Sequence, residues 1–456
     1  MQTTTTQKTL LYKILTVAGL CLALLVMLSS VTDIIYERSS TKEKVEQDIS
    51  ESWSGPQKLS GPVLIVPYQV KEMKTERIEG KNGFENIQTE ILINREKYFL
   101  PIILNVKSDI TTEERYRGIY KVPVYLSKTH MNGQFDLSEL ASGPNITWKA
   151  PYLVLGVSDI RGIKRSVEAQ LNGEPYPFQA GTQTTKIYQG LHAPLLVDIL
   201  KNGVIDFEIK LDLNGLKSFS ILPVGKYTKV EFSSTWPSPS FQGRYLPKNY
   251  DVSENGFNAT WETSYFATNM KQLFEDCFTA SSCQKFQDNG FGVTLHQGVD
   301  VYAQANRSTK YAILFIGLTF VVFFLFEVLK DLRIHAIQYG LVGVALVLFY
   351  LLLMSLSEHI AFVWAYLIAS LACIGLLSFY VTFVLKSIAR GLVFGSMISG
   401  LYGALFLLIQ AEDYALLLGA GFLFAVLAFI MVLTRHVDWA QMGQKADAVK
   451  ERGVVS

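Results

Sequence analysis

The sequence predicts an α+β membrane protein, with a large extracytoplasmic domain resembling an antiparallel β sandwich inserted between helix 1 and helix 2 of a six-helix transmembrane region. The first observation is that hydrophobic and charged residues occupy different parts of the chain. Hydrophobic residues make up 49% of it, yet it also contains 41 Lys and Arg and 40 Asp and Glu residues. Most charges gather in residues 36–306, whereas six long apolar runs lie outside that range. The second observation is that all 14 prolines lie within 36–306, among short runs rich in Val, Ile, Tyr and Phe.

The first apolar run, Ile14–Thr32, predicts an uncleaved membrane anchor. It is 19 residues long and free of charge, and Lys8 and Lys13 precede it. About twenty helical residues span the ~30 Å hydrocarbon core of a bilayer. A cleaved signal peptide is the alternative, but its apolar region is shorter and ends in a small-x-small site. We therefore predict that residues 1–35 form a cytoplasmic N-terminus and the first transmembrane helix.

The polar middle of the chain predicts a β-rich domain. Ile205, Phe207 and Ile209 alternate with polar residues, which is typical of a strand with one buried face. Turn dipeptides such as Asn-Gly and Ser-Gly separate runs of this kind, which favours antiparallel strands in a sandwich. Two stretches favour helices instead, Val45–Trp53 and Ala267–Phe274.

The remaining apolar runs predict a five-helix bundle over residues 307–435, followed by a cytoplasmic tail, 436–456. The five spans are expected at Tyr311–Leu329, Ile337–Leu356, Ala361–Leu385, Leu392–Gln410 and Tyr414–Thr434. Alternate connections carry the basic residues Lys330, Arg333, Lys386, Arg390 and Arg435. The other connections carry Glu358, Glu412 and Asp413 without any Lys or Arg. Because cytoplasmic loops are enriched in Lys and Arg, both termini are predicted to be cytoplasmic and residues 36–306 to lie outside.

Composition and motifs argue against several classes of function. A net charge of +1 without a basic stripe argues against nucleic-acid binding. The sequence has no zinc-ligand spacing, nucleotide-binding glycine motif or hydrolase signature, so no metal, cofactor or catalytic residue is predicted. His130, His192 and His296 are far apart in the sequence and are interpreted as structural or surface residues.

The segment from Trp236 to Pro247 combines aromatic residues with prolines and is the candidate ligand or partner surface. Its candidate contact residues are Trp236, Pro237, Pro239, Phe241 and Tyr245. Aromatic rings beside prolines form platforms for sugar rings or peptides. The same pattern is typical of a small core that closes the open end of a sandwich, and we favour that structural interpretation.

Two cysteines of the middle region, Cys277 and Cys283, are predicted to form a disulfide. Both lie in the part of the chain that is exported to an oxidising compartment, and the five residues between them can close the loop. Cys21 and Cys373 lie in apolar runs and are expected to behave as small buried hydrophobic residues.

Small residues in the C-terminal runs predict close approach of membrane helices. They are Gly391, Gly395, Gly400 and Gly403. This spacing favours either packing within the bundle or a homo-oligomer whose protomers meet at these glycines.

Several stretches resemble the family of the inner-membrane protein CreD. They are Arg115–Tyr125, Val157–Ile163, Gly190–Leu195 and Trp236–Pro247, together with the six-span arrangement. The resemblance implies a bacterial inner-membrane protein that is controlled by a two-component system and linked to envelope integrity and envelope stress. It places residues 36–306 in the periplasm and implies no reaction and no catalytic residue.

Three hypotheses about function follow. The leading one is a non-catalytic protein, embedded in the lipid bilayer, whose periplasmic domain binds an unknown envelope protein or glycan. The second is an enzyme that acts on envelope polysaccharide; it needs two facing carboxylates, and Asp159, Glu168 and Asp251 are available. The third and least favoured is a transporter, since Glu327 is the single ionisable residue within a predicted span. We expect the Glu327 carboxylate to reach the cytoplasmic interface and pair with Lys330.

Overall fold

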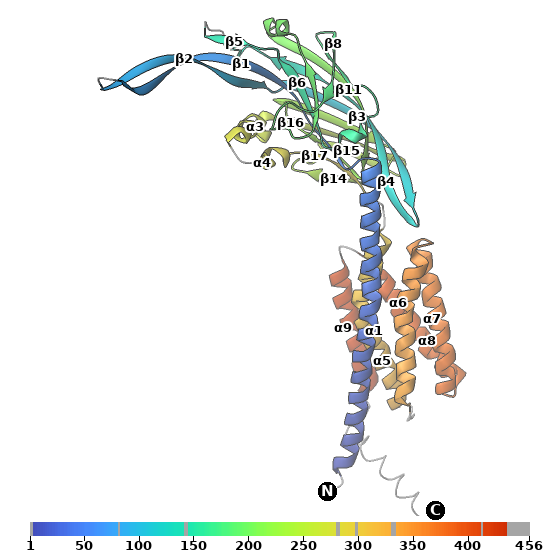
Figure 1. The fold of residues 1–456 in the computed structure, drawn as a ribbon. Coiled ribbons are helices and arrows are strands. Elements are labelled where there is room, and N and C mark those ends of the chain that lie inside the picture. The colour runs from blue at the N-terminus through green and yellow to red at the C-terminus, as the bar shows by residue number, and fades with distance from the viewer. Residues whose placement is uncertain are drawn as a thin grey trace, which may run out of the picture. The chain divides into compact units, whose positions relative to one another are not determined.

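The computed structural model describes residues 3–80, 83–140, 145–279, 283–296, 300–329, 334–411 and 414–435. The predicted cytoplasmic tail, 436–456, lies outside these ranges. The chain divides into two compact units (Figure 1). The helical unit consists of Met1–Glu43 with Val299–Ser456, and the β unit consists of Lys44–Gly298. The predicted domain boundaries at residues 36 and 306 lie near this division and stay predictions.

Long apolar helices make up the helical unit. They are α1 (Thr3–Ser52, which also enters the β unit), α5 (Val301–Leu329), α6 (Ala336–Ser357), α7 (Phe362–Val384), α8 (Ile388–Gln410) and α9 (Ala415–Thr434). Within the described residues, five stretches are long and apolar enough to cross a membrane: Ala18–Ser52, Val301–Phe324, Ala336–Ser357, Phe362–Val384 and Ile388–Gln410. The sixth predicted span corresponds to α9, whose described apolar stretch, Leu416–Val432, is shorter.

Helix α1 extends farther than the sequence analysis predicted. The anchor was expected to end near residue 35 and a separate helix to cover Val45–Trp53, whereas the structure has one helix of 50 residues. No glycine or proline occurs between Gly19 and Gly55, and Lys, Glu and Gln, which favour helices, recur after residue 36. Gly55 and Pro56 follow the last turn and prevent its continuation.

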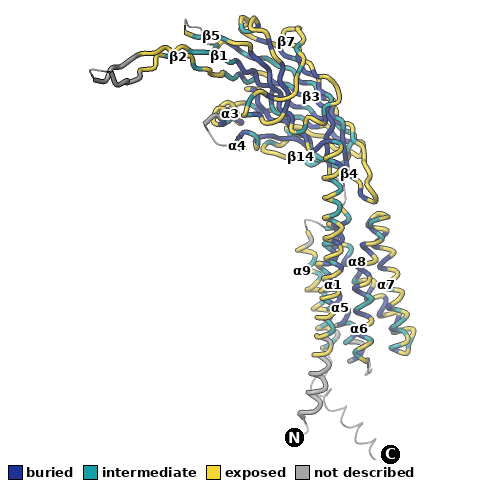
Figure 2. Tube along the Cα trace, in the orientation of Figure 1, coloured by how far each residue is buried: buried dark blue, intermediate teal, exposed yellow. Residues whose placement is uncertain are grey.

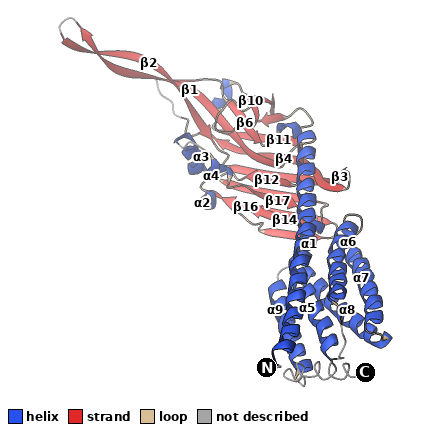
Figure 3. Cartoon of the chain, turned by 60° about the horizontal axis from the view of Figure 1, so that its bottom comes forward, coloured by secondary structure: helices blue, strands red, loops and turns tan. Residues whose placement is uncertain are grey.

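Two large sheets form the β unit (Figures 1 and 3). Over the described residues, the nine-stranded sheet contains β1 (Gln57–Gly80), β2 (Gly83–Phe99), β5 (Ile146–Trp148), β6 (Tyr152–Val157), β9 (Gln179–Ala180), β10 (Gly190–Pro194), β12 (Ser218–Leu222), β14 (Pro239–Gly243) and β17 (Phe291–Leu295). The eight-stranded sheet, counted in the same way, contains β3 (Ile103–Arg117), β4 (Tyr120–Asp136), β7 (Glu168–Leu171), β8 (Glu174–Pro177), β11 (Val204–Leu216), β13 (Tyr227–Ser234), β15 (Asn249–Ser253) and β16 (Gly256–Ser264).

Both sheets are mixed, which corrects the prediction of a purely antiparallel fold. Strand β1 pairs in parallel with β12, and β3 pairs in parallel with β13. The other strand pairs are antiparallel, such as the β3–β4 hairpin that turns at Gly118. A hairpin leaves a turn signal in the sequence, whereas parallel partners lie far apart in the chain and leave none.

The two sheets share one continuous hydrophobic core, as in a sandwich. Leu153 of the nine-stranded sheet and Phe135 of the eight-stranded sheet belong to the same buried cluster. Figure 2 shows the buried residues concentrated along these strands. The predicted alternation in β11 is confirmed, because Ile205, Phe207 and Ile209 are all buried.

The β1–β2 hairpin projects beyond the other strands, and three short helices follow β16 (Figures 1 and 3). The hairpin is paired from Leu64↔Phe99 to Gly80↔Gly83. The helices are α2 (Tyr265–Thr268), α3 (Met270–Thr279) and α4 (Gln284–Gln287), and two 3-10 turns, η1 (Ile160–Gly162) and η2 (Val197–Lys201), lie elsewhere in the unit. The helix predicted over Ala267–Phe274 is thus present, but it is split at Asn269, whose left-handed φ of 47° ends α2.

Candidate functional site

The predicted aromatic segment lies along one edge of the nine-stranded sheet. Its middle forms β14, which pairs with β17 and places Phe241 opposite Val293. The Trp236 indole donates a hydrogen bond from Nε1 to the His296 carbonyl at 2.8 Å. Pro237 is exposed, whereas Trp236, Pro239, Phe241 and Tyr245 are half-buried.

The rings of this segment pack inward. The ring centroid of Phe241 lies 5.5 Å from that of Tyr250, 5.8 Å from Phe257 and 5.6 Å from Trp261. Trp261 is fully buried and donates a hydrogen bond from Nε1 to the Tyr245 carbonyl at 3.1 Å. The segment therefore covers an aromatic part of the core, which favours the structural interpretation. A ligand surface here stays a prediction.

A cleft of about 830 Å³ lies between β2 and helix α3, and no pattern in the sequence indicates it. Its volume falls in the range of roughly 300–1,000 Å³ that is typical of ligand sites. Residues 94–99 of β2 line one side, and Met270, Lys271, Phe274 and Glu275 of α3 line the other. Phe99, Met270 and Phe274 are buried, so the cleft has an apolar floor. Its other lining residues are Pro67, Tyr68, Leu100, Ile102, Asp136, Glu139, Lys149, Val224, Gly225, Lys226 and Tyr265.

Glu96 in the cleft wall is held by two tyrosines. The Tyr98 hydroxyl donates to its carboxylate, and the Tyr152 hydroxyl does so at 3.2 Å. Burial, reinforced by the negative charge of Glu96, raises the pKa of Tyr98 and of Tyr152 above the ordinary tyrosine value. Both hydroxyls therefore keep their protons at neutral pH and remain donors to Glu96.

Several other charges at the cleft rim already have partners. Arg95 pairs with Glu72 at 2.6 Å, and Lys271 pairs with Glu139 at 3.5 Å. The Asp136 carboxylate accepts a hydrogen bond from the Ser138 N–H at 2.8 Å, which holds the pKa of Asp136 below its usual range.

Of the carboxylates considered for an enzyme, Asp159 is held by an arginine, and Glu168 and Asp251 lie far apart. Asp159 is paired with Arg161 at 2.6 Å. Glu168 lies on β7 and Asp251 on β15, which are six strand positions apart in the eight-stranded sheet. At about 4.8 Å per strand, the separation is on the order of 29 Å, too large for two carboxylates that act on one glycosidic bond.

The three histidines lie on different strands or loops. His192 is buried; its Nδ1 lies 2.7 Å from the Gly181 carbonyl and its Nε2 lies 2.7 Å from Gln183 Nε2. Since a carbonyl can only accept, Nδ1 is assigned the proton and Nε2 accepts from Gln183. His130 Nε2 lies 3.0 Å from the Glu208 carboxylate without the angles of a hydrogen bond. These positions agree with the structural interpretation.

Cys277 and Cys283 are both buried free thiols in the structure. Cys277 lies in α3, Cys283 precedes α4, and the two thiols are hydrogen-bonded to each other. Burial, with that hydrogen bond, raises the pKa of Cys277 to about 12. Because the thiolate is the reactive form, oxidation is slow in the folded unit, and we expect any disulfide to form during export. The disulfide stays a prediction.

Thiol labelling tests the disulfide. Unreduced, denatured protein is expected to react at Cys21 and Cys373 alone, and reduced protein at all four cysteines. Closing the loop is expected to stabilise the β unit by about 2.4 kcal/mol. The control is the variant Cys277→Ser with Cys283→Ser, whose labelling must not change on reduction. Labelling of all four thiols without reductant contradicts the prediction.

Sequence comparisons decide the family. The family model described as inner membrane protein CreD matches residues 9–440. The chain belongs to the CreD family. It is 36% identical over 438 residues to the inner membrane protein CreD of Escherichia coli (strain K12), and the match covers 94% of each chain. The CreD match and the apolar helices together make this a multi-pass protein of the inner membrane with a β-rich domain.

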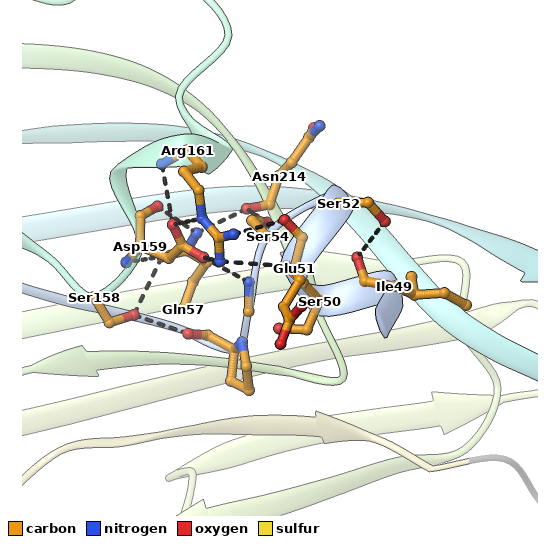
Figure 4. A network of polar contacts seen from close by, with 12 residues as sticks. Ile49, Ser50, Glu51, Ser52, Ser54, Gln57, Ser158, Asp159, Arg161 and Asn214 are labelled. Atoms are coloured by element: carbon orange, nitrogen blue, oxygen red, sulfur yellow. Dashed lines mark hydrogen bonds and ion pairs between the residues drawn. The ribbon is translucent and has the colours of Figure 1, made fainter. Parts of the chain in front are cut away.

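One of the stretches that carry the CreD resemblance, Val157–Ile163, binds the end of α1 (Figure 4). Arg161 donates from Nη1 to the Glu51 carbonyl at 2.6 Å and from Nη2 to the Ser50 carbonyl at 3.3 Å. Carbonyls in a last helical turn lack partners within the helix, and a cation there complements the helix dipole. Asp159 orients Arg161 through bonds of 2.9 and 2.6 Å, and this pairing lowers the pKa of Asp159.

Buried polar groups complete this α1 joint, which we define as Ser54, Gln57, Asp159, Arg161 and Gly162. Gln57 is 1% exposed and donates from Nε2 to the carbonyls of Asp159 and Asn214, both at 2.9 Å. Ser54 donates to the same Asn214 carbonyl at 2.8 Å. A Cβ on Gly162 would lie 2.3 Å from that carbonyl oxygen, so the joint has room for glycine alone.

A second CreD stretch, Arg115–Tyr125, supplies the surface on which the last turns of α1 pack. Val122 and Val124 form a small buried cluster with Ile49 of α1 and Leu216. Around it, Arg115 lies 4.7 Å from the Trp53 ring centroid, Arg117 pairs with Asp48 at 3.5 Å, and Lys217 pairs with Glu46. The last turns of α1 therefore belong to the fold of the β unit.

Glu327 is buried within the helical unit. Its side chain is 6% exposed and accepts hydrogen bonds from the Tyr339 hydroxyl at 2.9 Å and the Ile334 N–H at 3.3 Å. A buried carboxylate needs such donors, and here they join α5 to α6. The expected partner, Lys330, lies outside the described residues, so its pairing with Glu327 at the interface stays a prediction.

Two of the four glycines of α8 allow close contact with α7 of the same chain. A Cβ on Gly391 would lie 1.9 Å from Thr382 Oγ1, and one on Gly395 would lie 2.3 Å from Ser378 Oγ, both on α7. Gly400 and Gly403 are exposed, with no atom within 4 Å of a built Cβ. Packing within the bundle thus accounts for the first pair, and a contact between protomers at the second pair stays a prediction.

Alanine substitution distinguishes the glycines that pack on α7 from the exposed glycines of α8. Gly391→Ala is expected to destabilise the helical unit by about 1–3 kcal/mol, because α7 and α8 must move apart. Gly400→Ala is the matched control; it is expected to leave stability unchanged or to raise it by up to about 1 kcal/mol, since alanine favours helices. Thermal unfolding of the purified protein in detergent measures both. Equal effects would show that α8 does not pack on α7 at Gly391.

Proposed function

We propose that this chain spans the inner membrane six times, with both termini in the cytoplasm and residues 36–306 in the periplasm. Its proposed role is non-catalytic: the β unit binds an envelope protein or glycan and thereby contributes to envelope integrity and the response to envelope stress. The distribution of Lys and Arg among the connections supports this orientation. The cleft between β2 and α3 is the observation that supports binding.

Reporter fusions test the orientation. Reporters that work only outside the cytoplasm are expected to be active when fused after Asn306 or at Glu412, and inactive after Arg333, Arg390 or Arg435. Reporters that work only in the cytoplasm provide the control and are expected to give the opposite pattern. Periplasmic activity after Arg390 would overturn the six-span arrangement.

Blocking the cleft tests the binding function. Lys149 and Lys226 are exposed at its rim, so tryptophan at both positions fills the opening without disturbing the core. The variant Lys149→Trp with Lys226→Trp is expected not to restore growth under membrane stress in cells that lack the protein. The control, Lys128→Trp with Lys201→Trp, places the same rings at exposed positions outside the cleft and is expected to restore growth. Equal growth with both variants, at equal expression, argues against the cleft as the binding site.

The cleft carboxylates bear on the alternative of a polysaccharide-acting enzyme. A glycosidase needs a general acid with a raised pKa, whereas the pKa of Asp136 is lowered by its hydrogen bond from Ser138. Glu96 accepts from two tyrosines, and Glu139 is paired with Lys271. Contacts of this kind favour carboxylates that stay ionised and have a structural role over a carboxyl group that donates a proton in catalysis. Retained growth under stress with Glu275→Gln, the remaining cleft carboxylate, is the expected result for a binding domain.

A further inference from the structure

The exposed tyrosine and tryptophan side chains of the helical unit gather at one end of it. Among the side chains that the structure describes in this unit, they are Tyr36 (56% exposed), Trp364 (61%) and Tyr414 (67%). Tyr36 follows the apolar run of α1, Trp364 lies in the first turn of α7, and Tyr414 is the N-cap of α9. Every other tyrosine whose side chain is described in the unit, such as Tyr339 and Tyr402, is buried or half-buried.

Contacts between the helices place these three residues at the same end. Arg38, two residues after Tyr36, pairs at 3.8 Å with Glu358, which is the C-cap of α6. The connection from α6 to α7 starts at Glu358, so this pair lies beside the first turn of α7. The ring centroid of Tyr366, near the start of α7, lies 5.2 Å from that of Phe406, near the end of α8. The α8–α9 connection therefore lies at this end as well.

The chain changes from charged to apolar at the level of these aromatic residues. Residues 37–38, after Tyr36, and residues 412–413, before Tyr414, are all charged. In the opposite direction α7 and α9 expose long apolar side chains, which are Leu367, Ile368, Leu371, Leu416 and Leu417. Tyr and Trp are enriched where hydrocarbon meets lipid headgroups, because the ring packs among acyl chains while its O–H or N–H stays hydrated.

Ion pairs beyond Tyr36 mark the hydrated side of this level. Lys42 of α1 pairs at 3.3 Å with Asp300, which directly precedes α5, and Arg38 pairs with Glu358. One member of each pair is about half exposed, Arg38 at 50% and Asp300 at 45%. Charged side chains are costly in hydrocarbon, so the helices leave the hydrocarbon core before these two pairs.

We propose that Tyr36, Trp364 and Tyr414 bind the lipid headgroup layer of one leaflet and fix the depth of the helical unit in the bilayer. Headgroups add about 5–7 Å to each side of the ~30 Å hydrocarbon core. Asp33, one turn before Tyr36, then lies in the same layer, and the apolar run that ends at Thr32 lies in the core. The proposal concerns depth alone; under the proposed orientation this leaflet faces the periplasm.

Fluorescence quenching by brominated lipids measures the depth of Trp364. The full-length protein is placed in two sets of lipid nanodiscs, with bromine either high on the acyl chains, near the headgroups, or close to the bilayer centre. The contribution of Trp364 is the emission that the variant Trp364→Phe lacks. We expect the shallow bromines to quench this contribution at least about twofold more strongly than the deep bromines do.

Tryptophans placed elsewhere in the Trp364→Phe background provide the matched variants. Leu371→Trp lies about two turns farther along α7, about 10 Å deeper, and is expected to be quenched more strongly by the deep bromines. Glu43→Trp lies about two turns beyond Tyr36 at an exposed position and is expected to be quenched by neither lipid. Tyr36→Trp and Tyr414→Trp are expected to show the same order of quenching as Trp364.

Two results would overturn the proposal. The first is quenching of Trp364 that is stronger with the deep bromines, or absent with both lipids. The second is quenching of Glu43→Trp as strong as that of Tyr36→Trp, because α1 would then stay in the bilayer beyond Tyr36. Depth is measured without reference to the side of the membrane, so reversed reporter fusions would contradict the proposed orientation and leave this result unchanged.

Discussion

Replacing Phe241 by alanine is expected to lower the free energy of unfolding of the β unit by about 3 kcal/mol. The ring of Phe241 contacts those of Tyr250, Phe257 and Trp261, and its removal leaves a cavity over the buried Trp261. Chemical denaturation of the purified protein, followed by tryptophan fluorescence, measures the change. Growth under membrane stress is expected to fall only as far as the amount of folded protein falls.

Pro237→Ala is the control for Phe241. Pro237 lies in the same segment but is exposed, so its replacement is expected to change stability by at most about 0.5 kcal/mol and to leave growth unchanged. The opposite pattern supports a ligand platform: Phe241→Ala would then keep wild-type stability yet fail to protect the envelope. That result would restore the aromatic segment as the leading binding surface.

Replacing Gly162 by alanine is expected to destabilise the β unit by about 3 kcal/mol or to prevent its folding. The new methyl group would lie 2.3 Å from the Asn214 carbonyl oxygen and 2.6 Å from Gln57 Nε2. Relief of this contact separates Gln57 Nε2 from the two carbonyls to which it donates, and this buried NH2 group is left without acceptors. Because the α1 joint contains these groups, the last turns of α1 are expected to detach from the sheet.

Gly203→Ala is the matched control for Gly162. It makes the same substitution in the same unit, but no atom lies within 4 Å of the built Cβ. Its stability is expected to stay within about 0.5 kcal/mol of wild type. Limited proteolysis after Lys44 measures detachment of the helix, which is expected for Gly162→Ala and not for Gly203→Ala. Wild-type resistance of Gly162→Ala would show that the joint does not hold the end of α1.

Local patterns in the sequence predicted local structure. The alternation of Ile205, Phe207 and Ile209 identified a strand with one buried face, because side chains of a strand point to opposite sides in turn. The sequence also contains a signal for the full length of α1, because neither Gly nor Pro occurs between Gly19 and Gly55. The predicted anchor ended near residue 35 because the apolar run ends there, and the helix over Val45–Trp53 was predicted as a separate element.

Features assembled from distant segments could not be predicted in this way. The parallel pairing of β1 with β12 joins residues near 57 to residues near 219, and no short pattern records it. The cleft is built in the same manner, from β2, α3 and the loops that carry Lys149 and Lys226. Within the segment from Trp236 to Pro247, composition identified aromatic residues correctly, but it could not tell rings that face a ligand from rings that cover Trp261.

The central claim, that the cleft of the β unit is a binding site for an envelope component, is tested most directly by photocrosslinking in living cells. A photoreactive amino acid is placed at Lys226 or Glu275 in the cleft, and at Lys128 or Lys201 as exposed controls. Each variant must first restore growth under membrane stress. The account predicts one recurrent adduct from both cleft positions that is absent from both controls. Functional variants that yield no adduct from the cleft, or the same adducts from all four positions, would contradict it.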